Sequence, residues 1–124
     1  MDCVFCQIIN DHKNIILENE LAVAFYDSFP VSDGHVLIIP KRHCVTYFDL
    51  TSEEIKAIFE LSNKIKEILD NKYHPDGYNI GFNAGVDAGQ SVMHCHMHII
   101  PRYKGDIENP RGGIRKIVKN KTKY

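Results

Sequence analysis

The pattern of apolar and polar positions has the period of an α-helix between residues 50 and 75. Apolar side chains recur there at spacings of three and four residues, at Ile55, Ile58, Leu61, Ile65, Ile68 and Leu69. Thr51 and Glu54 form a capping box at the start of this segment, and Pro75-Asp76-Gly77 supplies a turn after it. The pattern predicts one long helix over Ser52–Lys72 with a single apolar face.

Shorter apolar segments flank this helix and predict strands separated by turns. The strands are expected at Ile15–Leu17, Leu21–Tyr26, His35–Ile39, Tyr78–Phe82 and Val92–Ile100. A short helix is expected at Phe5–Asn10. Because the regular alternation of strand and helix is absent, the order indicates an α+β fold. We expect a mostly antiparallel five-stranded sheet with the long helix on one face.

The composition is that of a soluble globular protein. The 124 residues are 44% hydrophobic and 25% charged, so we expect a single domain over residues 1–124. The net charge of −1 gives no reason to expect a nucleic-acid partner. Charge is uneven, because residues 102–124 carry +6 and residues 1–101 carry −7. The basic tail, from about residue 106, is expected to be a solvated end, with contact to an anionic substrate as the alternative.

Cysteine usage and the start of the chain bear on the compartment. No basic segment followed by a long apolar run comes after Met1, and no apolar run approaches the roughly 20 residues of a membrane span. We therefore expect a cytoplasmic protein with no membrane partner. In that compartment reduced thiols or metal ligands are favoured over disulfides for the four cysteines, Cys3, Cys6, Cys44 and Cys95.

Three histidines at spacing two, His94, His96 and His98, are the most informative feature of the chain. In an extended strand they share one face, while the apolar residues between them point to the other. A solvated polar face is disfavoured, since protonation of one imidazole opposes protonation of the next. Two chemical interpretations remain. The histidines could be metal ligands, as in all-β cupin-type sites, or one imidazole could be a nucleophile oriented by its neighbours.

The loop before these histidines favours the nucleophile. Residues 83–91 read NAGVDAGQS, and their small side chains allow backbone N–H groups to approach a phosphate. Alone, such a loop is more often a tight turn. Joined directly to the histidines, it predicts a phosphate-binding loop beside a nucleophile.

The stretch GQSVMHCHMHII at residues 89–100 resembles the signature of the histidine-triad (HIT) superfamily. Phe25-Tyr26-Asp27 and the segment 34–43, GHVLIIPKRH, resemble the N-terminal half of the same family. The resemblance runs from Cys3 to about Gly105 and implies a HIT-like fold.

The resemblance also implies roles for individual residues. His96 would be the nucleophile that becomes nucleotidylated, with no catalytic metal required. The residues expected to assist it are His98, His35, Ser91 and Gln90. Phosphate contacts are expected from Asn83, Gly89, Ser91 and His98, ribose contacts from Asp27, and base contacts from Phe5, Ile8 and Phe25. For the three apolar residues, core packing alone is the alternative.

The spacing of Cys3 and Cys6 leaves two interpretations open, a zinc site or two ordinary reduced cysteines. Some bacterial HIT proteins, and the related galactose-1-phosphate uridylyltransferases, hold a structural zinc with such a pair. The resemblance then implies His43 and His94 as the other two ligands.

The implied activity is hydrolysis of nucleoside 5′-monophosphate–X compounds by a homodimer. The substrates would be purine dinucleoside polyphosphates such as Ap3A or Ap4A, or nucleoside phosphoramidates. Alternatives are a nucleotidyltransferase or phosphorylase, which passes the group to phosphate or a sugar phosphate, and a non-catalytic nucleotide-binding protein. The chain lacks tryptophan and reads PRYKGD at 101–106, which looks more like the dinucleoside-polyphosphate (Fhit-like) branch than the phosphoramidase (Hint-type) branch. Asn109–Gly113 has no assigned role.

Overall fold

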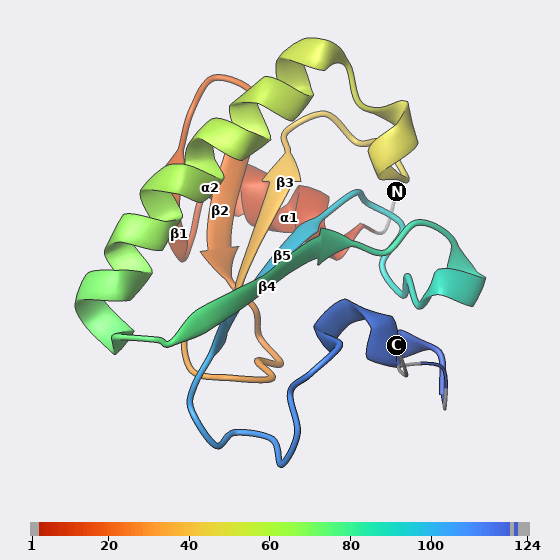
Figure 1. Ribbon diagram of the computed structural model, residues 1–124. Helices are drawn as coiled ribbons and strands as arrows, with labels where there is room; N and C mark the ends of the chain where they lie inside the picture. Colours follow the sequence, from red (N-terminus) through yellow and green to blue (C-terminus); the bar gives the residue numbers. More distant parts are fainter. Residues whose placement is uncertain (1–2, 120, 122–124) are drawn as a thin grey trace.

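The computed structural model describes residues 3–119 and 121 (Figure 1). Its strands form one antiparallel sheet in the order β1-β2-β3-β5-β4. They are β1 (Ile15–Glu18), β2 (Ala22–Tyr26), β3 (Val36–Pro40), β4 (Gly77–Phe82) and β5 (Met97–Arg102). The helices are α1 (Val4–Asp11) and α2 (Ser52–Tyr73), with 3-10 turns η1 (Tyr47–Asp49), η2 (Val86–Ala88) and η3 (Gly113–Ile117). The α+β fold with one long helix is confirmed.

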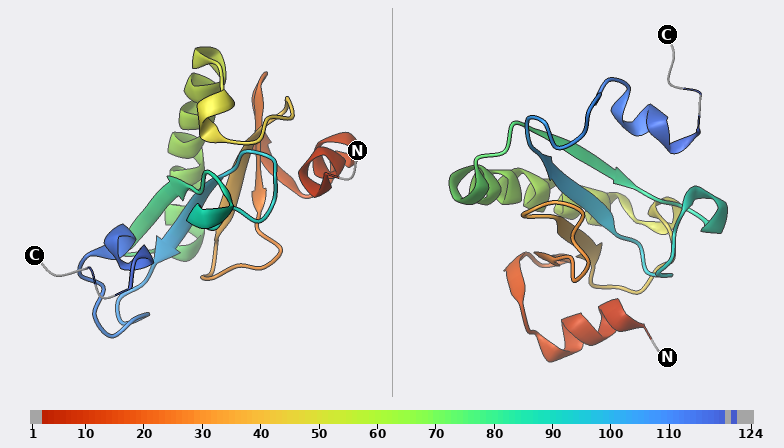
Figure 2. Two further views of the ribbon diagram at one scale, coloured as in Figure 1. Left: turned by 90° about the vertical axis from the view of Figure 1, so that its right-hand side faces the viewer. Right: turned by 90° about the horizontal axis from the view of Figure 1, so that it is seen from below.

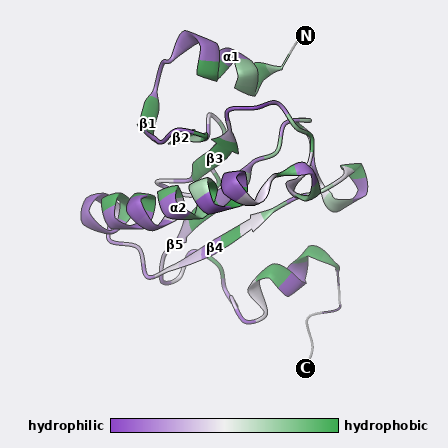
Figure 3. Ribbon diagram, turned by 90° about the horizontal axis from the view of Figure 1, so that it is seen from above, coloured by the Kyte–Doolittle hydropathy of each residue, from purple (hydrophilic) through white to green (hydrophobic). Residues whose placement is uncertain are grey.

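Helix α2 covers one face of the sheet. Its predicted capping box is present, since Thr51 Oγ1 accepts from Glu54 N–H at 3.1 Å and Glu54 Oε1 accepts from Thr51 N–H at 2.9 Å. The buried stripe consists of Ala57, Ile58, Leu61, Ile65 and Leu69, packed against Ala22, Ala24, Val36, Ile38, Met97 and Ile99 of the sheet. The predicted stripe included Ile55, which is only half-buried. In Figure 3, α2 alternates hydrophilic and hydrophobic residues, whereas β3 is hydrophobic.

Helix α1 packs on the opposite face, where Phe5 joins a second core cluster with Val23, Phe25, Leu37 and Ile39. Strands β2 and β3 are therefore covered on both faces, which explains why both read as continuous apolar runs. In both views of Figure 2, α1 and the C-terminal segment lie at opposite ends of the molecule.

The last strand differs from the prediction of Val92–Ile100, because β5 begins at Met97 and ends at Arg102. Before Met97 the chain leaves the sheet, and the N–H of Cys95 donates to the carbonyl of Cys44 at 2.7 Å. Pro101 does not end the strand. Strand β3 pairs only with residues 97–99, so it needs no hydrogen bond from the backbone nitrogen of Pro101. Only His98 of the three histidines therefore lies within a strand.

The C-terminal segment turns back beside the edge strand β4, where Gly113 of η3 lies against Asn79. Lys123 of the predicted basic tail lies outside the described residues. Among the helices that the structure describes, none combines the length and hydropathy of a membrane span.

Candidate active site

One cavity of about 320 Å³ brings together most of the residues that the sequence singled out. It opens between α1, the ends of β2 and β3, and the loop that precedes β5. The predicted residues that line it are Phe5, Ile8, Phe25, Asp27, Asn83, Gly89, Ser91, His96 and His98. His35 and Gln90 lie behind this lining, and both are buried.

His96 is held with one defined nitrogen available for chemistry. Its Nδ1 lies 2.8 Å from the carbonyl oxygen of His94, so the neutral ring carries its proton on Nδ1 and donates it there. The lone pair is then on Nε2. The ring is 6% exposed and packs edge-on against Phe5, with centroids 5.1 Å apart. His96 thus presents an imidazole of fixed orientation to the cavity.

His98 and His35 form a hydrogen-bonded relay that starts at the backbone. The N–H of Val31 donates to His35 Nδ1 at 3.2 Å, so the neutral His35 ring carries its proton on Nε2. That nitrogen lies 3.0 Å from His98 Nδ1 and donates a hydrogen bond to it. The proton of His98 is therefore on Nε2, the nitrogen remote from His35. The relay makes His98 a hydrogen-bond donor, well suited to a phosphate oxygen beside His96.

The loop before β5 is braced by Gln90, whose side chain does not line the cavity. Its Oε1 accepts from Gly85 N–H at 2.9 Å, and its Nε2 donates to Val45 O at 2.6 Å and Val92 O at 3.1 Å. The amide therefore has no donor left for a ligand. This geometry favours a positioning role for Gln90, and its predicted catalytic role stays a prediction. Gly89, at the cavity wall, has a φ of +97°, a conformation that favours glycine.

Asp27 stands at the start of the loop that joins β2 to β3. Its Oδ1 accepts from the N–H of Phe29 at 2.9 Å, and its Oδ2 lies 3.5 Å from His35 Nε2. The side chain is 18% exposed and lines the cavity. A carboxylate has about four acceptor positions, so capping the turn leaves capacity for ligand hydroxyls.

Four metal-ligating atoms converge where α1 begins. The donors of Cys3, Cys6, His43 and His94 all lie within 4.8 Å of one another. Cys3 Sγ and Cys6 Sγ are 3.4 and 3.5 Å from His94 Nδ1, and the two histidine Nδ1 atoms are 3.2 Å apart. Tetrahedral zinc with two thiolates and two imidazoles places such atoms about 3.4–3.8 Å apart. His94 Nε2 lies 2.9 Å from Pro40 O and donates to it, which leaves the Nδ1 lone pair for a metal.

A second cluster, Asp27, His35 and His98, also has its donor atoms within 4.8 Å of one another. Here the outer nitrogen of His35 faces a backbone donor, the N–H of Val31. A metal on Nε2 would therefore require an imidazolate ring, whereas a metal-bound histidine normally donates its other proton. The hydrogen bonding therefore favours a hydrogen-bonded relay at His35 and His98, whereas at His94 it leaves Nδ1 available to a metal.

A family model described as HIT domain matches residues 10–105. The chain belongs to the HIT family. The family assignment made from the histidine signature is therefore confirmed.

Solved structures of HIT proteins share this fold. A crystal structure of a HIT family member from Bacillus subtilis is 40% identical, with a TM-score of 0.79 and coverage of 85% of this chain and 76% of that one. A zinc-bound histidine triad family protein from Mycobacterium smegmatis is 36% identical, with a TM-score of 0.78 and coverage of 86% and 78%. The bis(5′-nucleosyl)-tetraphosphatase (asymmetrical) of Schizosaccharomyces pombe is 39% identical over 95 residues, which are 77% of this chain and 52% of that enzyme.

Burial shapes the titration of the relay in this HIT protein. Burial, together with the neighbouring imidazoles of His96 and His35, lowers the pKa of His98 to about 4 against the opposing effect of Asp27. Burial also lowers the pKa of His35, against the opposing effect of Asp27. Both rings are therefore neutral at pH 7, as the relay requires.

The same shift predicts how stability depends on pH. The folded pKa of His98 lies below the unfolded value of 6.5, so the unfolded chain binds the proton first as pH falls. The contribution of neutral His98 is complete above pH 6.5 and is lost as pH falls towards about 4. We expect the free energy of unfolding, measured by urea titration, to fall less steeply between pH 7 and 4.5 in His98→Asn than in wild type. Parallel pH profiles would contradict the shifted pKa.

Two features of the structure were not predicted from the sequence. Val4 and Phe29 also line the cavity, although neither matches a residue of the family signature. Glu54 is 4% exposed and is held by Arg42, whose Nε and Nη2 donate to the carboxylate at 3.0 and 2.8 Å. Only the capping role of Glu54 was visible from spacing, because its partner is twelve residues away.

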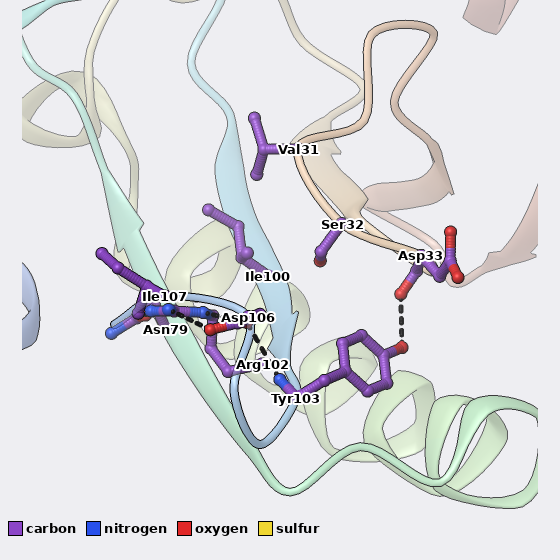
Figure 4. Close-up of a pocket in the computed structure, with 9 residues that line it drawn as sticks. All are labelled: Val31, Ser32, Asp33, Asn79, Ile100, Arg102, Tyr103, Asp106 and Ile107. Carbon is purple, nitrogen blue, oxygen red and sulfur yellow. Dashed lines mark hydrogen bonds and ion pairs between the residues drawn. The ribbon is translucent and has the colours of Figure 1, made fainter. Parts of the chain in front are cut away.

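A more open cavity of about 520 Å³ lies on the β4–β5 face of the HIT domain (Figure 4). Its one guanidinium, that of Arg102, already pairs with Asp106 at 2.7 Å and with Asn79 Oδ1 at 2.7 Å. No histidine or cysteine is among its described lining residues. The chemistry is therefore concentrated in the smaller histidine-lined cavity.

Proposed function

We propose that this HIT protein hydrolyses nucleoside 5′-monophosphate–X compounds through a nucleotidyl-His96 intermediate. The observation that carries the proposal is the hydrogen bond from His96 Nδ1 to the carbonyl of His94, 2.8 Å long, which leaves Nε2 as the nucleophile in the cavity. A purely binding protein has no need of that tautomer. Dinucleoside polyphosphates are our preferred substrates, with nucleoside phosphoramidates as the second group.

The reaction proceeds by two displacements at the α-phosphorus. In the first, the His96 Nε2–P bond forms as the bond from phosphorus to the leaving group breaks, and the leaving group departs with the electron pair. The proton on His96 Nδ1 stays in place, and its hydrogen bond to the carbonyl of His94 stabilises the resulting imidazolium. In the second, water attacks phosphorus, the N–P bond breaks, and the water proton passes to solvent. Nucleoside monophosphate is released.

The surrounding residues supply positioning and charge stabilisation. His98 Nε2–H donates to a phosphate oxygen, and His35 holds the tautomer that makes this possible. Asn83, Ser91 and the backbone at Gly89 contact the remaining phosphate oxygens. Asp27 accepts from the ribose, and Phe5, Ile8 and Phe25 receive a purine base.

We also propose that Cys3, Cys6, His43 and His94 hold a structural zinc. When bound, zinc would supply a cross-link between α1, the segment after β3 and the segment before β5. It has no part in the displacement. Because the thiols must stay reduced to bind metal, we place the protein in the cytoplasm.

A homodimer is the expected assembly. Support comes from β4, an outer strand of the sheet whose Ile80 is 46% exposed (Figure 1). Unpaired strand edges are the usual place where two sheets join. Sedimentation equilibrium should then give twice the chain mass of 14.2 kDa, and a monomer at all concentrations would contradict this assembly.

The direct test of the function is an intact-protein mass spectrum of enzyme quenched during turnover of a diadenosine polyphosphate. A gain of one adenylyl group supports the intermediate. Product analysis with Ap4A in the presence of inorganic phosphate separates hydrolysis, which yields AMP and ATP, from transfer to phosphate, which yields ADP and ATP. Binding without adduct or turnover would leave a nucleotide-binding protein and overturn the proposal.

Ribose recognition gives an independent test. A carboxylate that accepts from both ribose hydroxyls makes charge-assisted hydrogen bonds, each typically worth about 1.5–3 kcal/mol. Wild type should handle 2′-deoxy substrates at least about tenfold worse than ribose substrates in kcat/KM. Asp27→Ala should show little discrimination, because the group that reads the hydroxyl is gone.

The control for this test is Asp27→Asn, which keeps an oxygen for the turn at Phe29 but loses the charge. It should retain the melting temperature of wild type and lose part of the discrimination. If Asp27→Ala discriminates as wild type does, Asp27 only caps the turn, and the ribose assignment is wrong.

A further inference from the structure

The loop between β2 and β3 is held rigidly along its length. At its start, Asp27 N–H donates to His35 O at 3.0 Å and Phe29 N–H donates to Asp27 Oδ1 at 2.9 Å. Near its end, Ser32 Oγ donates to Pro101 O at 2.6 Å, and the hydroxyl of Tyr103 donates to Asp33 O at 2.6 Å. Figure 4 shows the bond between Tyr103 and Asp33. The backbone that carries Phe29 is therefore fixed before any ligand arrives.

At Gly34 the loop passes close to α2. The residue has a φ of +88°, and a Cβ there would lie 2.9 Å from the ring of Tyr73. A larger residue would clash with a packed side chain, so the loop can follow this path only with glycine. This contact adds a further restraint to the conformation of the loop.

Phe29 is nevertheless 86% exposed, the highest value among the large apolar side chains of the described residues. A rigid loop that holds an aromatic ring in water gives up the stabilisation that its burial would contribute. Phe29 lines the histidine cavity, as do the buried rings of Phe5 and Phe25, whose centroids are 5.5 Å apart. Val4, 58% exposed, lines the same cavity.

We propose that Phe29 stacks on the purine base of the bound nucleotide and helps to determine base affinity. The inference rests on the proposed function, because Asp27 fixes the ribose two residues away. A base is joined directly to the ribose, so it must lie within reach of residues that flank Asp27. Phe25, which precedes Asp27, lines the cavity as a buried ring, whereas Phe29, which follows it, lines the cavity as an exposed ring. The base is then held between buried apolar residues and one exposed ring, a contact that every purine can make.

The test compares two ligands that differ only in the base, AMP and ribose 5-phosphate, by titration calorimetry. In Phe29→Ala the affinity for AMP should fall about tenfold, the size of effect that loss of one base–aromatic stack produces. The affinity for ribose 5-phosphate should be unchanged, because that ligand has nothing to stack. Phe29→Tyr keeps the ring and should keep the affinity for AMP.

Phe48→Ala is the matched control, since Phe48 is 80% exposed but is absent from the cavity lining. It should leave both affinities unchanged, and neither alanine variant should lower the melting temperature. The inference is overturned if Phe29→Ala leaves AMP binding intact, or weakens both ligands equally by disturbing the loop. If wild type itself binds AMP no better than ribose 5-phosphate, the base pocket fails as well. The nucleotidyl adduct on His96, measured separately, shows whether the catalytic proposal survives either result.

Discussion

Replacing His96 with glycine or alanine is expected to lower kcat by at least about four orders of magnitude, as removal of a covalent nucleophile does in other enzymes. The reason is that no other described group offers a lone pair at the same place, since the proton relay commits His98 to donation. Affinity for AMP should change little, because base and ribose contacts supply the ground-state binding. Steady-state kinetics with a diadenosine polyphosphate and calorimetry with AMP measure the two quantities.

Two controls make the His96 result specific. His12→Asn alters an exposed histidine at a left-handed position, which asparagine tolerates, and should keep full activity. His96→Gly leaves room for imidazole, which should restore part of the rate, whereas no adduct should form on the protein. A His96→Ala rate within about tenfold of wild type, less than about 1.4 kcal/mol of barrier, would mean that another group is the nucleophile.

Protein purified without added metal should contain one zinc per chain, and chelation should lower its melting temperature by about 10–20 °C. The expected size follows from the geometry, because four ligands from three separate segments lose their common cross-link together. Metal analysis and thermal unfolding with and without chelator provide the measurement. Exchange of zinc for cobalt should leave kcat unchanged within about twofold, since the metal has no role in the displacement.

Cys3→Ser and Cys44→Ala form a matched pair for the zinc prediction. Both remove a thiol, but Cys44 is 5% exposed in the core and is not among the converging ligands. Cys3→Ser should lose the metal, and Cys44→Ala should retain it even if packing suffers. If wild type contains no metal, or if wild type and Cys3→Ser contain equal zinc, then Cys3 and Cys6 are ordinary reduced cysteines and the zinc proposal is wrong.

Local signals in the sequence were sufficient for most of the fold. The capping box at Thr51 placed the start of α2 correctly, and the alternation of turns and apolar runs located β1 to β4 within two residues. These features depend on neighbours in sequence, which spacing reveals. The prediction of one domain over residues 1–124 stays a prediction, because the family model matches only residues 10–105.

The misplaced strand has a long-range cause. The apolar pattern from Val92 onward is that of a strand, but Cys95 bonds to Cys44 and His94 to Pro40, both distant in sequence. Such partners leave no local signal. Neighbouring side chains still alternate in direction before β5 begins, because Cys95 is buried in the core while His96 lines the cavity.

The candidate site likewise contains features that the sequence predicts and features that depend on residues distant in sequence. Residues of the signature converged on one cavity because the motif fixes their spacing relative to His96. The tautomers could not be predicted, since they depend on the N–H of Val31 and the carbonyl of His94. The hydrogen bonds of Gln90 could not be predicted either, because its sequence neighbours contact the cavity, whereas its own amide donates to the carbonyls of Val45 and Val92.

The convergence of Cys3, Cys6, His43 and His94 also sets an order of events during synthesis. A ribosome makes the chain from the N-terminus, so the two thiols emerge first and the last ligand, His94, emerges 91 residues after Cys3. Through that interval a captured ion has at most three protein ligands, and α1 has no closed site to anchor it. A zinc site on these four residues, and with it the wall of the cavity that Phe5 provides, would be completed only when nearly the whole sheet has been translated.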